Sequence, residues 1–199
     1  MELVGFLMIF VGIIILLYAV YLFFKLIILK FKYKQIRSQT EWHKNGFHPM
    51  FELVARYIVF KKECGDLDIT KKFSNYSVNY TFGTTKGGLG LVGATEISIA
   101  LERAKIIETT VYNYEYEGKL ISIRRKHKAI VNSQKNLTKV LSNIEILKKN
   151  VGTREEIREL YRLQSNEKRK RLGMNLLDEK WDEIETTKIK DACYLYLMK

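Results

Sequence analysis

Proline, cysteine and the residues of familiar catalytic motifs are scarce in this sequence. It has one proline and two cysteines among 199 residues, and it contains no proline-rich linker, repeat or low-complexity tract. Cys64 and Cys193 fit no metal or redox spacing, so both are predicted to be free thiols. No G-x-S-x-G, C-x-x-C, P-loop or H-E-x-x-H motif occurs. These absences favour a binding or assembly role over an enzyme, and no catalytic residue or cofactor is predicted.

Residues that could ligate a metal are also few. No H-x-x-x-H pairing joins the histidines, and His43 and His48, which flank a polar segment, are expected to face water. Glu63, Asp66 and Asp68 could hold a cation, but an acidic turn of this kind is typically solvated. No metal site is therefore predicted.

The N-terminal segment is the most specific feature of the sequence. Leu3 to Phe24 is a run of 22 residues without a charge. As a helix it is roughly 33 Å long, enough to cross a hydrocarbon core of about 30 Å. A cleaved signal peptide is the alternative, but no basic residue precedes the run and no A-x-A-like site follows it. Residues 1–30 are predicted to form a retained transmembrane helix with a basic juxtamembrane extension.

Charge predicts the orientation of this helix. No Lys or Arg precedes the span, whereas five follow it before the next acidic residue: Lys25, Lys30, Lys32, Lys34 and Arg37. The positive-inside rule therefore places the N-terminus outside and the remainder of the chain in the cytoplasm. The same five side chains are expected to contact the membrane surface, since the whole chain carries 34 Lys and Arg against 22 Asp and Glu.

Small residues recur at intervals of seven within the span. Gly5, Gly12 and Ala19 share one stripe of the helix. Helices in lipid associate where small residues let their backbones approach closely. The stripe predicts that the span self-associates or packs against another membrane protein.

The rest of the chain is predicted to form a connector and one α+β domain. Residues 31–47 include a polar stretch with a glycine and are read as the connector. The domain, residues 48–199, is predicted to contain a small antiparallel sheet over about 75–128 and C-terminal helices over about 132–190. It begins with a helix in "MFELVARYIVF", where Phe51, Val54, Ala55 and Ile58 have helical spacing.

Alternating side chains predict the strands. Apolar and polar residues alternate from Tyr76 to Phe82 and again along Thr95, Ile97, Ile99 and Leu101, although the latter segment also fits a helix through Ile97, Ala100, Leu101 and Ala104. "KIIETTVYNYEYEGKLISIRRK" predicts a hairpin with a tight turn at Glu117-Gly118. Its three tyrosines are expected on one face: Tyr112, Tyr114 and Tyr116.

Helical spacing returns after residue 131. One apolar stripe predicts a helix that ends at Gly152, and its members are Leu137, Val140, Leu141, Ile144, Leu147 and Val151. Thr153 to Glu156 form a capping box for a second helix that stops near Gly173. A third helix is predicted to start near Asn175, with Leu177, Trp181 and Ile184 facing inward.

A glycine-rich segment supplies the main alternative function. Gly88, Gly90 and Gly93 have the G-x-G-x-x-G spacing of a dinucleotide loop. Such a loop needs a buried strand directly before it, and here the preceding residues form a polar turn. The favoured reading is a flexible loop, and the alternative is a membrane-tethered nucleotide-binding sensor or enzyme that uses Gly87–Gly93.

A second basic run ends the helix that follows Gly152. Its cations complement the negative end of the helix dipole, and they are also candidates for contact with an anionic group: Lys168, Arg169, Lys170 and Arg171. Binding of single-stranded nucleic acid is not expected, because no aromatic residue lies among these cations.

Two short segments resemble parts of LemA-type membrane proteins. They are "ISIALERAKIIE" and "EGKLISIRRKHKAIV", which together cover less than a fifth of the chain. The resemblance implies an all-helical membrane protein. The segment containing Asn and Pro that this family has after its Arg-rich helix is missing, and the tyrosine alternation between the two patches favours strands.

Together these features predict a single-pass membrane-anchored protein with a cytoplasmic binding domain. We expect it to act as an accessory or scaffold subunit of a membrane complex. The expected partners are the lipid bilayer, another membrane protein or further copies of the chain.

Overall fold

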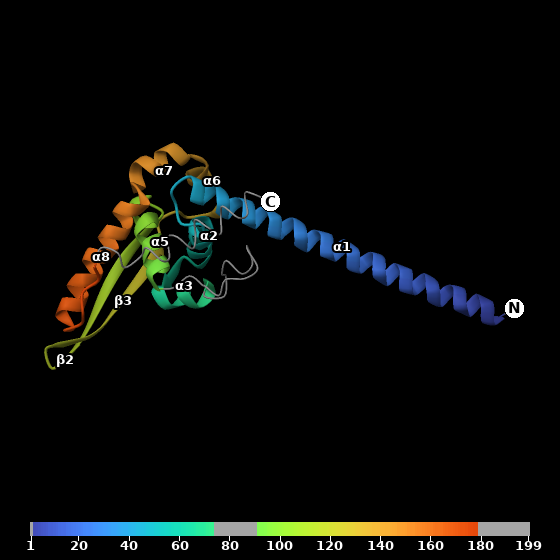
Figure 1. Ribbon diagram of the computed structural model, residues 1–199, viewed down its shortest axis with the longest axis horizontal. Coiled ribbons are helices and arrows are strands. Elements are labelled where there is room, and N and C mark those ends of the chain that lie inside the picture. Colours follow the sequence, from blue (N-terminus) through green and yellow to red (C-terminus); the bar gives the residue numbers. More distant parts are fainter. Residues whose placement is uncertain (1, 74–90, 179–199) are drawn as a thin grey trace. The chain divides into compact units, whose positions relative to one another are not determined.

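The computed structural model describes residues 2–73 and 91–178 and has an α+β fold, as the sequence predicts (Figure 1). The chain divides into two compact units, residues 1–37 and 38–199. The described elements are α1 (Glu2–Lys44), α2 (Phe51–Lys61), β1 (Glu63–Gly65), α3 (Asp66–Phe73), α5 (Leu91–Arg103), β2 (Ile107–Tyr116), β3 (Lys119–Ala129), α6 (Gln134–Ser142), α7 (Ile144–Val151) and α8 (Arg154–Arg171).

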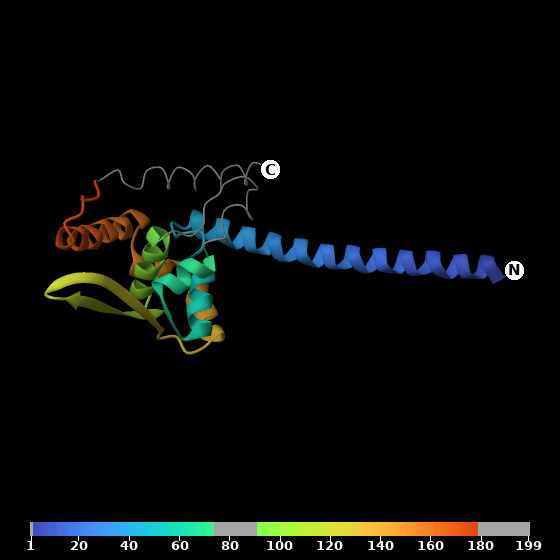
Figure 2. The same cartoon turned by 90° about the horizontal axis from the view of Figure 1, so that it is seen from below.

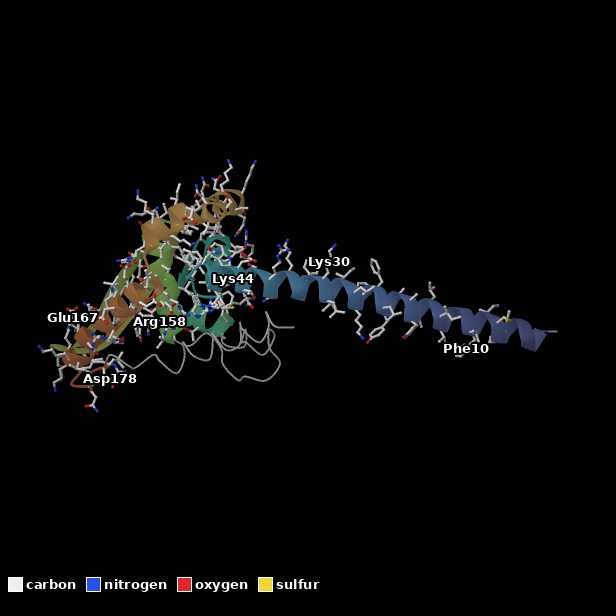
Figure 3. The ribbon with its side chains drawn as sticks, turned by 45° about the horizontal axis from the view of Figure 1, so that its top comes forward. Phe10, Lys30, Lys44, Arg158, Glu167 and Asp178 are labelled. Carbon is white, nitrogen blue, oxygen red and sulfur yellow. The ribbon has the colours of Figure 1, made fainter. Side chains whose placement is uncertain are left out.

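Helix α1 contains a segment that is long and apolar enough to cross a membrane. This segment spans Met8–Phe31, 24 residues. Its side chains are exposed, and Figure 3 shows Phe10 and Lys30 projecting from the helix. The helix continues to Lys44, so most of the segment 31–47, which is predicted to be a connector, is regular helix.

The core of the second unit begins earlier than predicted. Trp42, Phe47 and Phe51 are buried together, with ring centroids 4.9 to 5.4 Å apart. The predicted inward face of α2 is confirmed, since Phe51, Val54, Ala55 and Ile58 are fully buried. His48 is buried as well, so the expectation that it faces water is wrong: the aromatic cluster on both sides of it excludes solvent.

Residues 91–103 form helix α5, and the predicted strand there is wrong. Alternation suggested a sheet face and a solvent face, but Thr95, Glu96, Ile97 and Ser98 are all buried. Helix α5 is buried on nearly every side, so the order of polar and apolar residues along it follows neither the helical period of 3.6 nor the strand period of two. Only the helical spacing Ile97, Ala100, Leu101, Ala104 identifies the element.

The sheet of the described chain has three antiparallel strands in the order β1-β3-β2. The predicted hairpin is confirmed, and its turn has φ of +49° at Glu117 and +72° at Gly118. Positive φ at both central residues is typical of a type I′ turn, whose twist matches that of the strands. β1 pairs only with residues 126–128 of β3, so the far part of the hairpin is two-stranded within the described sheet.

The helix predicted to end at Gly152 is interrupted at Asn143. The stripe from Leu137 to Val151 belongs to two helices, α6 and α7, because the Asn143 side chain accepts a hydrogen bond from the Ile146 amide and starts a new helix. Gly152, with φ +81°, ends α7 as predicted, and the capping box of Thr153 and Glu156 is present.

Helix α8 ends at Arg171, close to the predicted stop at Gly173. Residues 174–178 are not helical, which corrects the predicted start of a third helix near Asn175. The strands of the hairpin also contradict the all-helical alternative. Several predicted features lie outside the described residues: the strand at 76–82, Gly88, Gly90, Cys193, and the helix positions Trp181 and Ile184.

Candidate binding surface

The β2–β3 hairpin presents one face to solvent, here called the outer face. In an antiparallel pair, residues directly opposite each other share a face. Tyr112 lies opposite Arg124, Tyr114 opposite Ser122, and Tyr116 opposite Lys119. The outer face comprises Glu108, Thr110, Tyr112, Tyr114 and Tyr116 of β2, and Lys119, Ser122, Arg124, Lys126 and Lys128 of β3.

Two columns of different chemistry run along the outer face. The rings form the column on β2, with Tyr112 45%, Tyr114 48% and Tyr116 65% exposed. The column on β3 is cationic, and the guanidinium carbon of Arg124 lies 5.1 Å from the centroid of the Tyr114 ring. Stacking of this kind holds the arginine over an aromatic surface without covering its hydrogen-bond donors.

The acidic residues of this surface are confined to the base of the hairpin. Lys128 Nζ lies 3.4 Å from Glu108 Oε1, and Lys126 Nζ lies 2.6 Å from Glu63 Oε2. The hydrogen bond to Glu63 raises the pKa of Lys126, and the same contact lowers the pKa of Glu63. Toward the turn, no carboxylate of the described residues forms an ion pair with Arg124. The outer half of the face is therefore aromatic and positively charged.

The opposite, inner face of the hairpin is tied into the domain by His127. This residue is fully buried, and its Nε2 lies 2.7 Å from Asp66 Oδ1 while Nδ1 lies 3.1 Å from Thr109 Oγ1. Ser98 Oγ lies 3.4 Å from the same Nε2 but donates to the Ala94 carbonyl at 2.8 Å.

The geometry around His127 is that of a structural network. A nucleophile relay places the carboxylate and the hydroxyl on opposite ring nitrogens, with the hydroxyl open to substrate. Here Ser98 and Asp66 share Nε2, the Thr109 hydroxyl lies at Nδ1, and the imidazole between them is fully buried, so all of its polar contacts are within the domain. The network joins α3, α5, β2 and β3, and so fixes which way the hairpin faces.

The predicted acidic turn does not form a cation site. Its carboxylates each face a different side chain: Glu63 meets Lys126, Asp66 meets His127, and Asp68 Oδ2 lies 3.9 Å from Lys61 Nζ. No group of three metal-ligating side chains occurs among the residues that the structure describes.

Helix α8 is held against α5 by a buried charged cluster. Glu96 is 2% exposed and accepts hydrogen bonds from both Nε and Nη2 of Arg154, while Arg158 Nε lies 3.2 Å from Glu96 Oε2. Figure 3 shows Arg158 among the helices of the domain. Two arginines against one carboxylate leave this interior electropositive.

The pKa of His48 is lowered by its burial and by this positive charge. Burial and then the nearby guanidinium groups of Arg154 and Arg158 hold the pKa of His48 well below its usual range. Its Nδ1 accepts a hydrogen bond from the Met50 amide at 3.1 Å, which also requires an unprotonated nitrogen. The imidazole is therefore neutral in the folded domain.

The C-terminal end of α8 lies beside the hairpin. Arg171 Nη2 is 3.4 Å from Glu115 Oε1, and both views show this helix end near the hairpin turn (Figures 1 and 2). Glu115 belongs to the inner face, so the basic run Lys168 to Arg171 adds positive potential behind the tyrosines rather than among them.

The other predicted site residues are not brought together. Gly93 lies inside the first turn of α5, while Gly88 and Gly90 fall outside the described residues, so nucleotide binding by the glycine loop stays an untested prediction. A Cβ added at Gly12 would meet nothing within 4 Å, which leaves that face of α1 open. The juxtamembrane cations lie on α1: Lys25, Lys30, Lys32, Lys34 and Arg37.

The alternation of residues predicts that the three tyrosines share one face, but it does not show which side chains lie beside them on the neighbouring strand. Regular pairing from a two-residue turn at Glu117-Gly118 would place Ile123 opposite Tyr112. Only the register shift between Tyr114 and Glu115 brings Arg124 there, so no local signal in the sequence gives this pairing.

Comparison with known proteins finds no family model, no curated protein and no solved structure that matches this chain.

Proposed function

We propose that the protein is a single-pass membrane-anchored binding protein whose C-terminal domain holds an anionic partner through the outer face of the hairpin. The observation that carries the proposal is the exposed column of tyrosines beside a column of Lys and Arg. Among the residues that make up the outer face, the acidic residue Glu108 lies at the base, where it is paired with Lys128.

The N-terminal helix supports the anchor, and the distribution of charge supports a cytoplasmic domain. The apolar segment Met8–Phe31 has the required length. Five cations follow the uncharged run and none precede it. A reporter fused after Lys199 should therefore report the cytoplasm, and an external location would reverse the proposed orientation.

A role within a membrane complex is the second part of the proposal. Gly12 offers open space for close approach of another helix, in line with Gly5 and Ala19. Gly12→Leu should reduce crosslinking of the full-length protein in membranes, while Val11→Leu, on another face, should not. Equal crosslinking of all three proteins would reduce the helix to an anchor.

A charge-matched comparison tests the outer face. Full-length protein in neutral detergent should bind immobilised heparin, which serves as a general polyanion. The double variant Lys119→Ser/Arg124→Ser should elute at lower salt than wild type because two phosphate-like contacts are lost. The control removes two exposed cations elsewhere, Lys139→Ser/Lys149→Ser, and should elute later than the outer-face variant. Equal elution of the two variants would mean that only net charge matters.

A further inference from the structure

We infer that the partner of the outer face is a single-stranded nucleic acid, with its bases on the tyrosines of β2 and its phosphates on the cations of β3. The inference rests on the proposed function, since it names the ligand class of the same surface. It also revises the sequence-based expectation, which found no aromatic residues among the basic ones.

The tyrosines are arranged as a stacking platform. Side chains two residues apart on a strand are about 6.6 to 6.8 Å apart along it, so the three rings form a regular row. Tyr112 and Tyr116 are the outer members of the row and are about half exposed or more. Unpaired bases splayed along a flat protein surface stack on such rings, and this stacking tolerates any base sequence.

The cations lie where a phosphate backbone would run. Arg124 and Lys119 are directly opposite Tyr112 and Tyr116 across the strand pair. A strand of nucleic acid lying along the hairpin would then have each base on β2 and the neighbouring phosphate on β3. Arg124 already lies over Tyr114, and its planar guanidinium can itself stack on a base while donating to phosphate.

The composition of the outer face disfavours a lipid surface. Peripheral membrane segments bury Leu, Phe or Trp side chains beneath the headgroups. The ten residues of the outer face include no aliphatic side chain, and its only rings are those of tyrosines. It therefore has little to insert into a bilayer, although it has the charge to approach one.

The basic end of α8 extends the positive field around the hairpin. Arg171 contacts Glu115 on the inner face, which places the run beginning at Lys168 close behind the turn. Longer strands would pass from the hairpin to this helix end. Short oligonucleotides that occupy only the outer face should bind through the tyrosines and depend less on α8.

The test measures binding of labelled oligonucleotides to full-length protein in nanodiscs of uncharged lipid, by fluorescence anisotropy. Single-stranded DNA and RNA of about 12 nucleotides, within the usual site size of such surfaces, are compared with a duplex of the same length. We expect both single strands to bind more tightly than the duplex. Their relative affinities show which of the two nucleic acids is preferred.

Variants of the rings and of the cations should behave differently. Tyr112→Ala and Tyr116→Ala should each weaken single-strand binding about five- to a hundredfold, with an unchanged salt dependence. Lys119→Ser/Arg124→Ser should lower the slope of log affinity against log salt by about 1.4, since each phosphate contact contributes about 0.7. Phe60→Ala, which truncates an aromatic ring 78% exposed on α2, is the matched control and should bind as wild type.

A conservative variant and a stability measurement distinguish loss of binding from loss of folding. Tyr112→Phe retains the ring, so it should retain single-strand affinity, and thermal unfolding of each variant shows whether the domain is intact. Preferential binding of the duplex or of anionic vesicles, or tyrosine variants that bind as wild type, would overturn the inference while leaving an anionic partner in place. Loss of heparin binding, vesicle binding and oligonucleotide binding alike would overturn the proposed function as well.

Discussion

The two faces of the hairpin are built from the same strands and differ in nearly every physical respect. On the inner face, Ile107 and His127 are buried, and His127 is bonded to Asp66 and Thr109. On the outer face, Tyr112 and its neighbours make few contacts and remain exposed. A strand pair can therefore place the residues that stabilise the fold and the residues that bind a partner on opposite faces, at alternate positions along each strand.

The difference in burial between the two faces becomes smaller from the base of the hairpin toward its turn. Near the base, the inner face packs against α5, where His127 Nε2 lies 3.4 Å from Ser98 Oγ. Farther out, Val111 on the same face is 54% exposed. The outer half therefore relies on its turn, on the Arg124–Tyr114 stack and on the Arg171–Glu115 contact.

The largest loss of stability is expected from a substitution in helix α5, against which the inner face packs. Glu96→Ala leaves Arg154 and Arg158 buried without their carboxylate, which should cost about 3–5 kcal/mol of unfolding free energy. Urea denaturation of the full-length protein in detergent measures it. Glu102→Ala, an exposed acid on the same helix, should change stability by less than about 0.5 kcal/mol. Similar losses in the two variants would mean that the cluster does not hold α8.

The next largest loss of stability is expected on the inner face itself, where two positions can be compared. Ile107→Ala removes a side chain that is 1% exposed and should cost about 2–5 kcal/mol. Val111→Ala, four residues nearer the turn, should cost less than about 1 kcal/mol because that side chain is half exposed. Equal costs would show that the outer half of the hairpin is packed as tightly as the base.

A pH effect of intermediate size is expected from His48. Burial and the two arginines depress its pKa in the folded state, so below about pH 6.5 the unfolded chain binds a proton that the folded chain does not. Stability should therefore fall by up to about 1.4 kcal/mol per pH unit as the pH drops below 6.5. In His48→Gln this loss should disappear from the stability profile between about pH 7.5 and about pH 5.5. An unchanged slope in the variant would assign the loss to another group.

The smallest effect on stability is expected on the outer face. Tyr114→Ala removes the stack with Arg124 and one cross-strand pair, and should cost about 0.5–1 kcal/mol. A matched thermal melt and oligonucleotide titration of this variant should therefore show a small change in stability and a large change in binding. A cost comparable to that of Ile107→Ala would contradict the division between the faces.

Local rules were sufficient for the parts of the fold that are set by neighbouring residues. The Glu117-Gly118 turn, the end of α7 at Gly152 and the capping box at Thr153 each depend on a few consecutive residues, and all three were predicted. The amphipathic helix α2 was predicted because one of its faces is buried and the other is not.

Features set by distant partners were not predicted. Glu96 has the polarity of a surface residue, and only Arg154 and Arg158, far along the chain, explain why it is buried. His127 meets Asp66, 61 positions away. Such contacts allow polar side chains to be buried, so the polarity of Glu96 predicts a solvent-exposed position that the structure does not show.

The two-residue turn makes the length of the hairpin more important than its composition. Inserting or deleting a single residue in β2 before Tyr112 would shift the period, so that Val111, Asn113 and Glu115 would occupy the outer positions and the tyrosines would turn inward. By contrast, exchanging one tyrosine for another aromatic ring would leave the platform intact. Relatives of this protein should therefore vary freely in the identity of their rings and cations, but they should keep the number of residues between Ile107 and Gly118 unchanged.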